Sequence, residues 1–148
     1  MPLIPIPAED LPKRVEKMDE SAVYRGIIRA FDVADKLNKS NHKYCTMNVQ
    51  VIEPLEWKDR SVTDSHIQLP GKFDESGNSI PLNDYEMKRE MEAMGQATGL
   101  GRLCASAQMK GKFEKEDFLG KEISFMIKND EYPKGSDNWL PKIAIFLE

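Results

Sequence analysis

The chain has 148 residues and a net charge of −4, with 40% hydrophobic and 31% charged residues, which is typical of an ordinary globular domain that needs neither disulfides nor metals. It has no apolar stretch long enough for a membrane helix, and Cys45 and Cys104 have neither a disulfide-framework nor a zinc-site spacing. We therefore expect a cytoplasmic protein without cofactors and without membrane contact.

The first twenty residues form a segment of their own. Four prolines fall within the first twelve residues, and proline supplies no amide donor and disfavours helix in the residue before it. The sequence therefore predicts an extended arm over residues 1–20, followed by one folded domain over residues 21–148. No basic region precedes an apolar run here, so a secretory signal is not expected.

Three strands are predicted in the first half, over residues 22–33, 44–54 and 61–70, from alternating apolar residues and β-branched or aromatic enrichment. Gly26 predicts a bulge or bend that curls the sheet toward a barrel. Strict alternation divides the first strand into two faces: Tyr24, Gly26, Ile28 and Ala30 against Arg25, Ile27, Arg29 and Phe31.

A helix is predicted over residues 83–95, because Asn83 followed by Glu86 resembles a capping box and the next apolar residues recur at helical spacing. Those residues are Tyr85, Met87, Met91 and Met94. We expect the methionines to pack in the core rather than to form a binding groove. A second short helix is predicted within residues 100–109, with Leu100, Leu103 and Cys104 facing inward.

Two more strands are predicted at residues 123–128 and 143–147, where apolar residues alternate again. Between them lie about fourteen residues rich in Asn, Asp, Gly, Pro and Ser, which predict a long loop. Long loops in compact domains are often functional. The alternative is a simple connector in which Trp139 folds back onto the core, and the sequence leaves both open.

The element order is three strands, a helix and two strands. This order predicts a mainly β protein with one or two helices, built as a five-stranded antiparallel barrel like that of the oligonucleotide/oligosaccharide-binding (OB) fold. In that fold the helix lies between the third and fourth strands, and the loops after the first and fourth strands flank the ligand face.

Several short motifs carry a family resemblance over most of residues 20–148. They are the Tyr24, Gly26, Ile28 pattern, the VIEP end of the second strand, a glycine at the helix end, the run Phe118, Leu119, Gly120, Lys121, and the late Tyr132 and Asn138. On these motifs the chain resembles the small single-stranded DNA-binding proteins of tailed phages. The resemblance implies an OB fold and sequence-tolerant binding of single-stranded DNA in phage DNA replication or recombination, in the cytoplasm of the infected host.

Many such proteins end in a disordered acidic tail that recruits phage or host replication and recombination proteins, whereas this sequence ends in a predicted strand. Recruitment through a tail is therefore not expected.

Binding of single strands requires cations for phosphates and aromatic faces for bases. The candidate nucleic-acid-binding residues are Arg25, Arg29, Phe31, Lys36, Lys39, Lys43, Tyr44, Trp57, Lys58, Arg60, Tyr132, Lys134 and Trp139. For each aromatic residue a core position, and for each cation a solvated surface, stays open.

An enzyme is not expected. His42, Cys45 and His66 suggest a metal or thiol site, but no third ligand has a telling spacing, and the sequence has no phosphate-binding loop or nucleophile motif. The competing hypothesis is a protein-interaction module, such as a phage protein that binds a host factor through the Pro-rich arm or a strand edge. The sequence leaves open the oligomeric state, including a homo-oligomer, and the choice between DNA and RNA.

Overall fold

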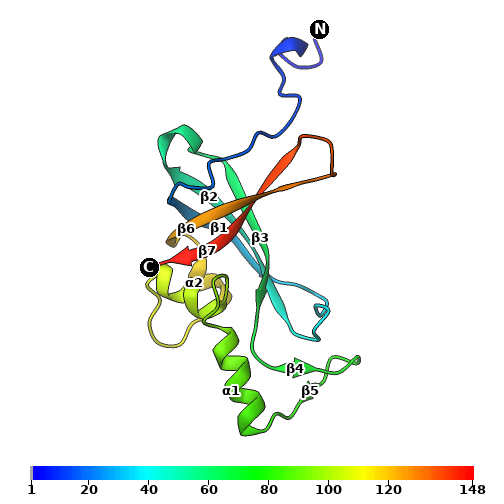
Figure 1. Cartoon of the computed structure of the whole chain (residues 1–148), viewed down its shortest axis with the longest axis vertical. Coiled ribbons are helices and arrows are strands. Elements are labelled where there is room, and N and C mark those ends of the chain that lie inside the picture. The colour runs from blue at the N-terminus through cyan, green and yellow to red at the C-terminus, as the bar shows by residue number, and fades with distance from the viewer. Residues whose placement is uncertain (1) are drawn as a thin grey trace.

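The computed structural model describes residues 2–148 apart from the side chain of Ser65, and Met1 of the predicted arm lies outside that range. Five long strands form one antiparallel sheet in the order β3-β2-β1-β6-β7 (Figure 1). They are β1 (Tyr24–Val33), β2 (Tyr44–Glu53), β3 (Ser61–Gln68), β6 (Glu122–Glu131) and β7 (Trp139–Leu147). The prediction of a mainly β protein with an antiparallel sheet is confirmed.

The shorter elements lie between β3 and β6. They are the hairpin of β4 (Lys72–Phe73) and β5 (Ser79–Ile80), then α1 (Asp84–Ala93) and α2 (Leu100–Ser106). Single turns of 3-10 helix occur at Ala8–Asp10, Leu55–Trp57 and Lys115–Phe118. Both helices thus lie where the sequence predicted them. Within the described residues, no helix is long and apolar enough to cross a membrane.

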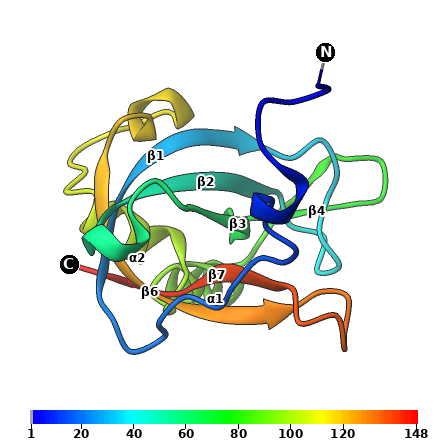
Figure 2. The same ribbon diagram turned by 90° about the horizontal axis from the view of Figure 1, so that it is seen from above.

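The sheet is strongly curled, so that β1 and β2 arch over β6 and β7 when the molecule is viewed from above (Figure 2). Its two edge strands, β3 and β7, approach each other. No β-ladder joins them in residues 2–148, so the barrel is not closed. Gly26 contributes to the curl, because the pairing of β1 with β2 shifts register beside it. A Cβ atom at Gly26 would lie 2.4 Å from Cγ1 of Val49, so the close approach of the strands requires glycine.

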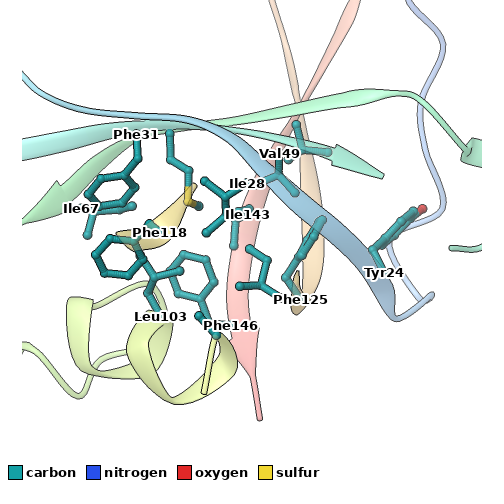
Figure 3. Packing of buried hydrophobic residues seen from close by; sticks show 14 of the residues in the cluster. Tyr24, Ile28, Phe31, Val49, Ile67, Leu103, Phe118, Phe125, Ile143 and Phe146 are labelled. Carbon is teal, nitrogen blue, oxygen red and sulfur yellow. The ribbon is translucent and has the colours of Figure 1, made fainter. Parts of the chain in front are cut away.

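A second irregularity in β1 changes which side chains face inward. The pairing with β2 shifts between Ile28 and Ala30, so Phe31 turns into the core and is only 5% exposed. Its ring stacks on that of Phe118 with centroids 4.3 Å apart (Figure 3). The prediction that Phe31 shares the outer face of Arg25 and Arg29 is therefore wrong.

The core fills the inside of the curled sheet. Strands β1, β2, β3, β6 and β7 contribute to it, and Leu103 of α2 lies beneath them with Phe118 and Phe146 (Figure 3). The inward position predicted for Leu103 is confirmed. Helix α2 is fixed to β6 because the Ser106 hydroxyl donates to the backbone oxygen of Ser124 and accepts from its N–H, at 3.1 and 2.9 Å.

Helix α1 begins with the predicted capping box between Asn83 and Glu86, but it projects away from the sheet (Figure 1). Only Glu90 is buried within it, and Met94, just after its last residue, is also buried. Met87 and Met91 are 45% and 58% exposed. The expected core position is therefore confirmed for Met94 and wrong for these two methionines.

The loop between the last two strands is shorter than predicted. Strands β6 and β7 pair as far as Glu131 and Trp139, so only residues 132–138 connect them. Asn129 and Asp130, which suggested turn, instead pair with Pro141 and Leu140 in the ladder. The hairpin thus projects as paired strands with a seven-residue tip, residues 132–138.

Candidate nucleic-acid interface

The loop between β1 and β2, residues 34–43, is held against the rest of the molecule at its far end. Nε2 of His42 lies 2.6 Å from Oε1 of Glu90 in α1, and the Gly71 N–H donates to the same oxygen at 3.1 Å. His42 is only 4% exposed, and its Nδ1 is buried without a hydrogen-bond partner among residues 2–148. This buried pair fixes the loop to α1 and to the chain that follows β3.

Next to this loop, two aromatic rings stack on the outer surface of β2 and β3. The ring centroids of Tyr44 and His66 are 5.6 Å apart, with an angle of 10° between the ring planes. The register of β2 with β3 shifts between Cys45 and Met47, which places two residues of β3 opposite Thr46. His66 thereby faces outward beside Tyr44.

A surface depression of about 580 Å³ joins the stacked rings to the loop. Its lining includes Lys36, Asn38, Lys39, Tyr44, His66 and Gln68. Lys36 and Lys39 are exposed, and neither forms an ion pair within the described part of the chain. The Asn38 amide donates to the Gln68 side-chain oxygen at 3.1 Å. Cations, aromatic faces and amides therefore meet in one place.

Lys43 lies at the edge of this region but faces elsewhere. Its ammonium group is 4.7 Å from the centroid of Phe73 in β4.

Cys45, which the sequence offered as a thiol candidate, is buried, and this burial raises its pKa to about 11. The thiol therefore stays protonated near neutral pH and is a poor nucleophile. No cluster of metal-ligating side chains occurs among the described residues.

The two arginines of β1 are exposed on its outer surface, but both already have partners. Arg25 pairs with Glu122 and lies 3.8 Å from Glu53. Arg29 donates to the Gln50 side-chain oxygen at 2.8 Å. Neither arginine lines the depression beside Tyr44. The structure therefore does not bring them together with the lysines of the β1–β2 loop.

The residues predicted from the β2–β3 connection differ in their surroundings. Trp57 is half-buried and packs against the core, and its indole Nε1 is buried without a hydrogen-bond partner among residues 2–148. The Arg60 guanidinium lies 5.5 Å from the centroid of that indole. Lys58 is exposed. Trp57 therefore anchors this hairpin and does not offer a free ring face to a base.

Part of the N-terminal arm is attached to the folded domain. We call residues 14–20 the strap; it crosses the end of the sheet between the β2–β3 and β6–β7 hairpins (Figures 1 and 2). The Val15 N–H donates to the Asn138 side chain at 2.8 Å, and the Trp139 N–H donates to the Val15 oxygen at 3.0 Å. Met18 is buried in the core at 2% exposure. Residues 2–13 are exposed and continue away from the domain.

The strap covers Trp139. Nζ of Lys17 lies 3.9 Å from the indole centroid, and the indole N–H donates to Asp137 at 2.8 Å. Tyr132 and Lys134, at the tip of the hairpin, are exposed. Of the three residues predicted here, Trp139 is thus half-buried beneath the strap at the start of β7, whereas Tyr132 and Lys134 are exposed.

Comparison with known proteins does not indicate a function for this site. Models of known protein families give no match to the chain, and neither do curated proteins. Function must therefore be inferred from the residues themselves. Sequence reasoning considered His66 only for a metal or thiol site, because strict alternation along β3 gives no signal that it would lie beside Tyr44.

Proposed function

We propose that this protein is a non-enzymatic OB-fold protein that binds single-stranded DNA with little sequence preference. The order β3-β2-β1-β6-β7, with the helices between β3 and β6, supports the fold proposal because an OB barrel has the same element order. The β1–β2 loop and the β6–β7 hairpin then correspond to the two loops that flank the ligand face in that fold.

The stacked pair of Tyr44 and His66 beside Lys36 and Lys39 is the observation that carries the binding proposal. Every base has a π face, so stacking on such rings tolerates any sequence. Lysines without a carboxylate partner can neutralise phosphates and release their counterions. These groups supply binding chemistry alone. A role in phage DNA replication or recombination rests on the family resemblance.

The proposal is tested by titrating labelled oligo-dT with the full chain at two salt concentrations. Tyr44→Ala should weaken binding by about 1–3 kcal/mol, the usual cost of losing one stacking partner, and Tyr44→Phe should keep most of the affinity. Tyr85→Ala is the matched control, because Tyr85 is 67% exposed on α1 outside the depression. Absence of binding at about 50 mM salt, or equal affinity for duplex DNA, would contradict the proposal.

The exposed end of the arm favours a second function, which is the binding of a partner protein. Leu3 is 99% exposed, and Ile4, Ile6 and Leu11 are also exposed. Apolar side chains in an extended segment are the type of feature that a partner protein can bind. A truncation that lacks residues 2–13 separates the two functions. It should bind oligo-dT as the full chain does if the depression is the binding site.

A further inference from the structure

Two lysines lie directly opposite each other on the last two strands. Lys128 of β6 is paired with Lys142 of β7 in the ladder, and both side chains are exposed. Like charges in this arrangement destabilise a sheet. Asp130 lies 3.0 Å from Nζ of Lys142, whereas Lys128 forms no ion pair within residues 2–148. The pair therefore has an excess of positive charge that an anion would neutralise.

This lysine pair is connected to the stacked rings through β3. The His66 N–H donates to Oδ1 of Asp64 at 3.1 Å. Burial raises the pKa of the Asp64 carboxyl, while the His66 N–H and the charges of His66, Lys142 and Lys128 act in the opposite direction. Asp64 is therefore near enough to both places to be influenced by their charges, and its strand β3 contacts β7, which carries Lys142.

Asp64 is half-buried, and its Oδ1 is already occupied by the His66 N–H. Its Oδ2 is buried and has no hydrogen-bond partner in the described part of the chain. A phosphodiester that passes from β3 to β7 would thus meet the two ammonium groups, and at Lys142 it would replace the contact with the solvent-accessible Asp130 carboxylate. Strand β3 carries His66 and contacts β7, which carries Lys142, so the ring pair and the lysine pair lie on adjacent strands.

We propose that Lys128 and Lys142 form a second phosphate-contact site for the same nucleic-acid strand, which crosses from β3 to β7 after leaving the depression beside Tyr44. This inference rests on the proposed function and extends it, because it assigns a path to the strand and a site that the sequence analysis did not include. Binding sites of OB folds cover about 4–16 nucleotides. Short oligonucleotides should therefore occupy only the depression, and longer ones should reach both lysines.

The test compares the full chain with the double variant Lys128→Gln/Lys142→Gln. Both are titrated with labelled oligo-dT of about 6 and about 20 nucleotides over a series of salt concentrations. With the longer strand, the log-log salt slope should be shallower by about 0.7–1.4, since each phosphate contact contributes roughly 0.7 and Lys142 adds its share if it exchanges Asp130 for a phosphate. With the shorter strand, affinity and slope should be unchanged.

Two further variants serve as controls. Lys110→Gln/Lys112→Gln makes the same change in charge at exposed positions between α2 and β6 and should leave both slopes unchanged. Lys128→Arg/Lys142→Arg keeps the charge and should retain the slope of the full chain. Thermal unfolding of the glutamine variant should show little change in stability, because it removes both the repulsive lysine pair and the solvent-accessible ion pair of Lys142 with Asp130.

The outcomes separate this inference from the function on which it rests. If the full chain binds neither oligonucleotide, the proposed function fails and the second site fails with it. If it binds both, but the lysine variant matches the Lys110 and Lys112 control on the longer strand, only the second site is refuted. Inorganic phosphate at matched ionic strength should not remove the difference between the variants. If it does, the pair is a free-phosphate site and the inference is wrong.

Discussion

Asn129 is predicted to be the main attachment point of the strap. Its side chain accepts the Met18 N–H at 3.2 Å and donates to the Met18 oxygen at 2.8 Å and to the Glu20 carboxylate at 3.0 Å. At about 1 kcal/mol for each hydrogen bond, Asn129→Ala should lower the free energy of unfolding by about 2–4 kcal/mol. The upper part of this range applies if Met18, which is 2% exposed, also leaves the core.

Urea denaturation of the full chain measures this loss as a lower midpoint at nearly constant slope. Asn48→Ala is the matched control, because the Asn48 side chain makes one hydrogen bond, at 3.3 Å to Thr63, and should cost less than about 1 kcal/mol. Met18→Ala should cost about 2–5 kcal/mol. Its combination with Asn129→Ala should be less than additive, since both act through the same segment.

A loss below about 0.5 kcal/mol for Asn129→Ala would show that the strap contributes little and would refute this reasoning. The oligo-dT titration of the same variant adds a second readout. Affinity should be unchanged if Trp139 is a structural residue under Lys17. A clear gain in affinity would instead identify Trp139 as a stacking residue that the strap blocks.

Three other substitutions are predicted from the structure. Phe31→Ala should lower the free energy of unfolding by about 3–5 kcal/mol in urea denaturation, because its ring is buried against Phe118; a stable variant with weakened oligo-dT binding would contradict this. Asp64→Asn should stabilise the protein at neutral pH, because burial raises the carboxyl pKa in the folded state. That advantage should disappear on acidification below about pH 4, where the unfolded aspartate is protonated as well, and an advantage that persists there would refute the cause. Glu90→Ala should speed amide hydrogen exchange at Gly71, whose N–H loses its acceptor, and Glu90→Gln should restore much of the protection.

The alternation of apolar residues predicted the strands well wherever the ladder is regular. Ile123, Phe125 and Ile127 are all buried, as their period-two spacing indicated. Helical spacing of apolar residues, with the capping-box pattern at Asn83 and Glu86, also predicted the positions of the helices. These features follow from local sequence, because each strand buries one face and the start of α1 has a side-chain cap.

Alternation failed where a strand contains an extra residue. Each such residue moves the following side chains to the opposite face. Phe31 turns inward after the shift near Ile28, and Phe146 turns inward after the shift opposite Met126. The shift between Cys45 and Met47 likewise lies beside His66. Bulges depend on the twist and curl of the whole sheet, so no pattern within one strand reveals where they occur.

The sequence also did not predict which cations form ion pairs, because their partners are distant along the chain. Arg25 meets Glu122, and Arg14 meets Asp137. From the sequence alone, these arginines cannot be distinguished from the lysines of the β1–β2 loop. In the folded protein, Lys36 and Lys39 face solvent, whereas both arginines have carboxylate partners.

The salt dependence of binding distinguishes an interface that uses all the sequence-predicted cations from one that uses only a few lysines. If all eight cations among the sequence-predicted residues contacted phosphates, the log-log slope on single strands would be about −5.6, at roughly −0.7 for each contact. Lys36, Lys39 and Lys128, which form no ion pair within residues 2–148, give about −2.1, and Lys142 extends this to about −2.8 if it exchanges Asp130 for a phosphate. An arginine that already pairs with a carboxylate has few counterions to release, so its contact with a phosphate adds little to the slope. A measured slope between about −2.1 and −2.8 on long oligo-dT would therefore support an interface limited to these four lysines. A slope near about −5.6 would require all eight sequence-predicted cations to contact phosphates, with the ion pairs of Arg25 opening on binding.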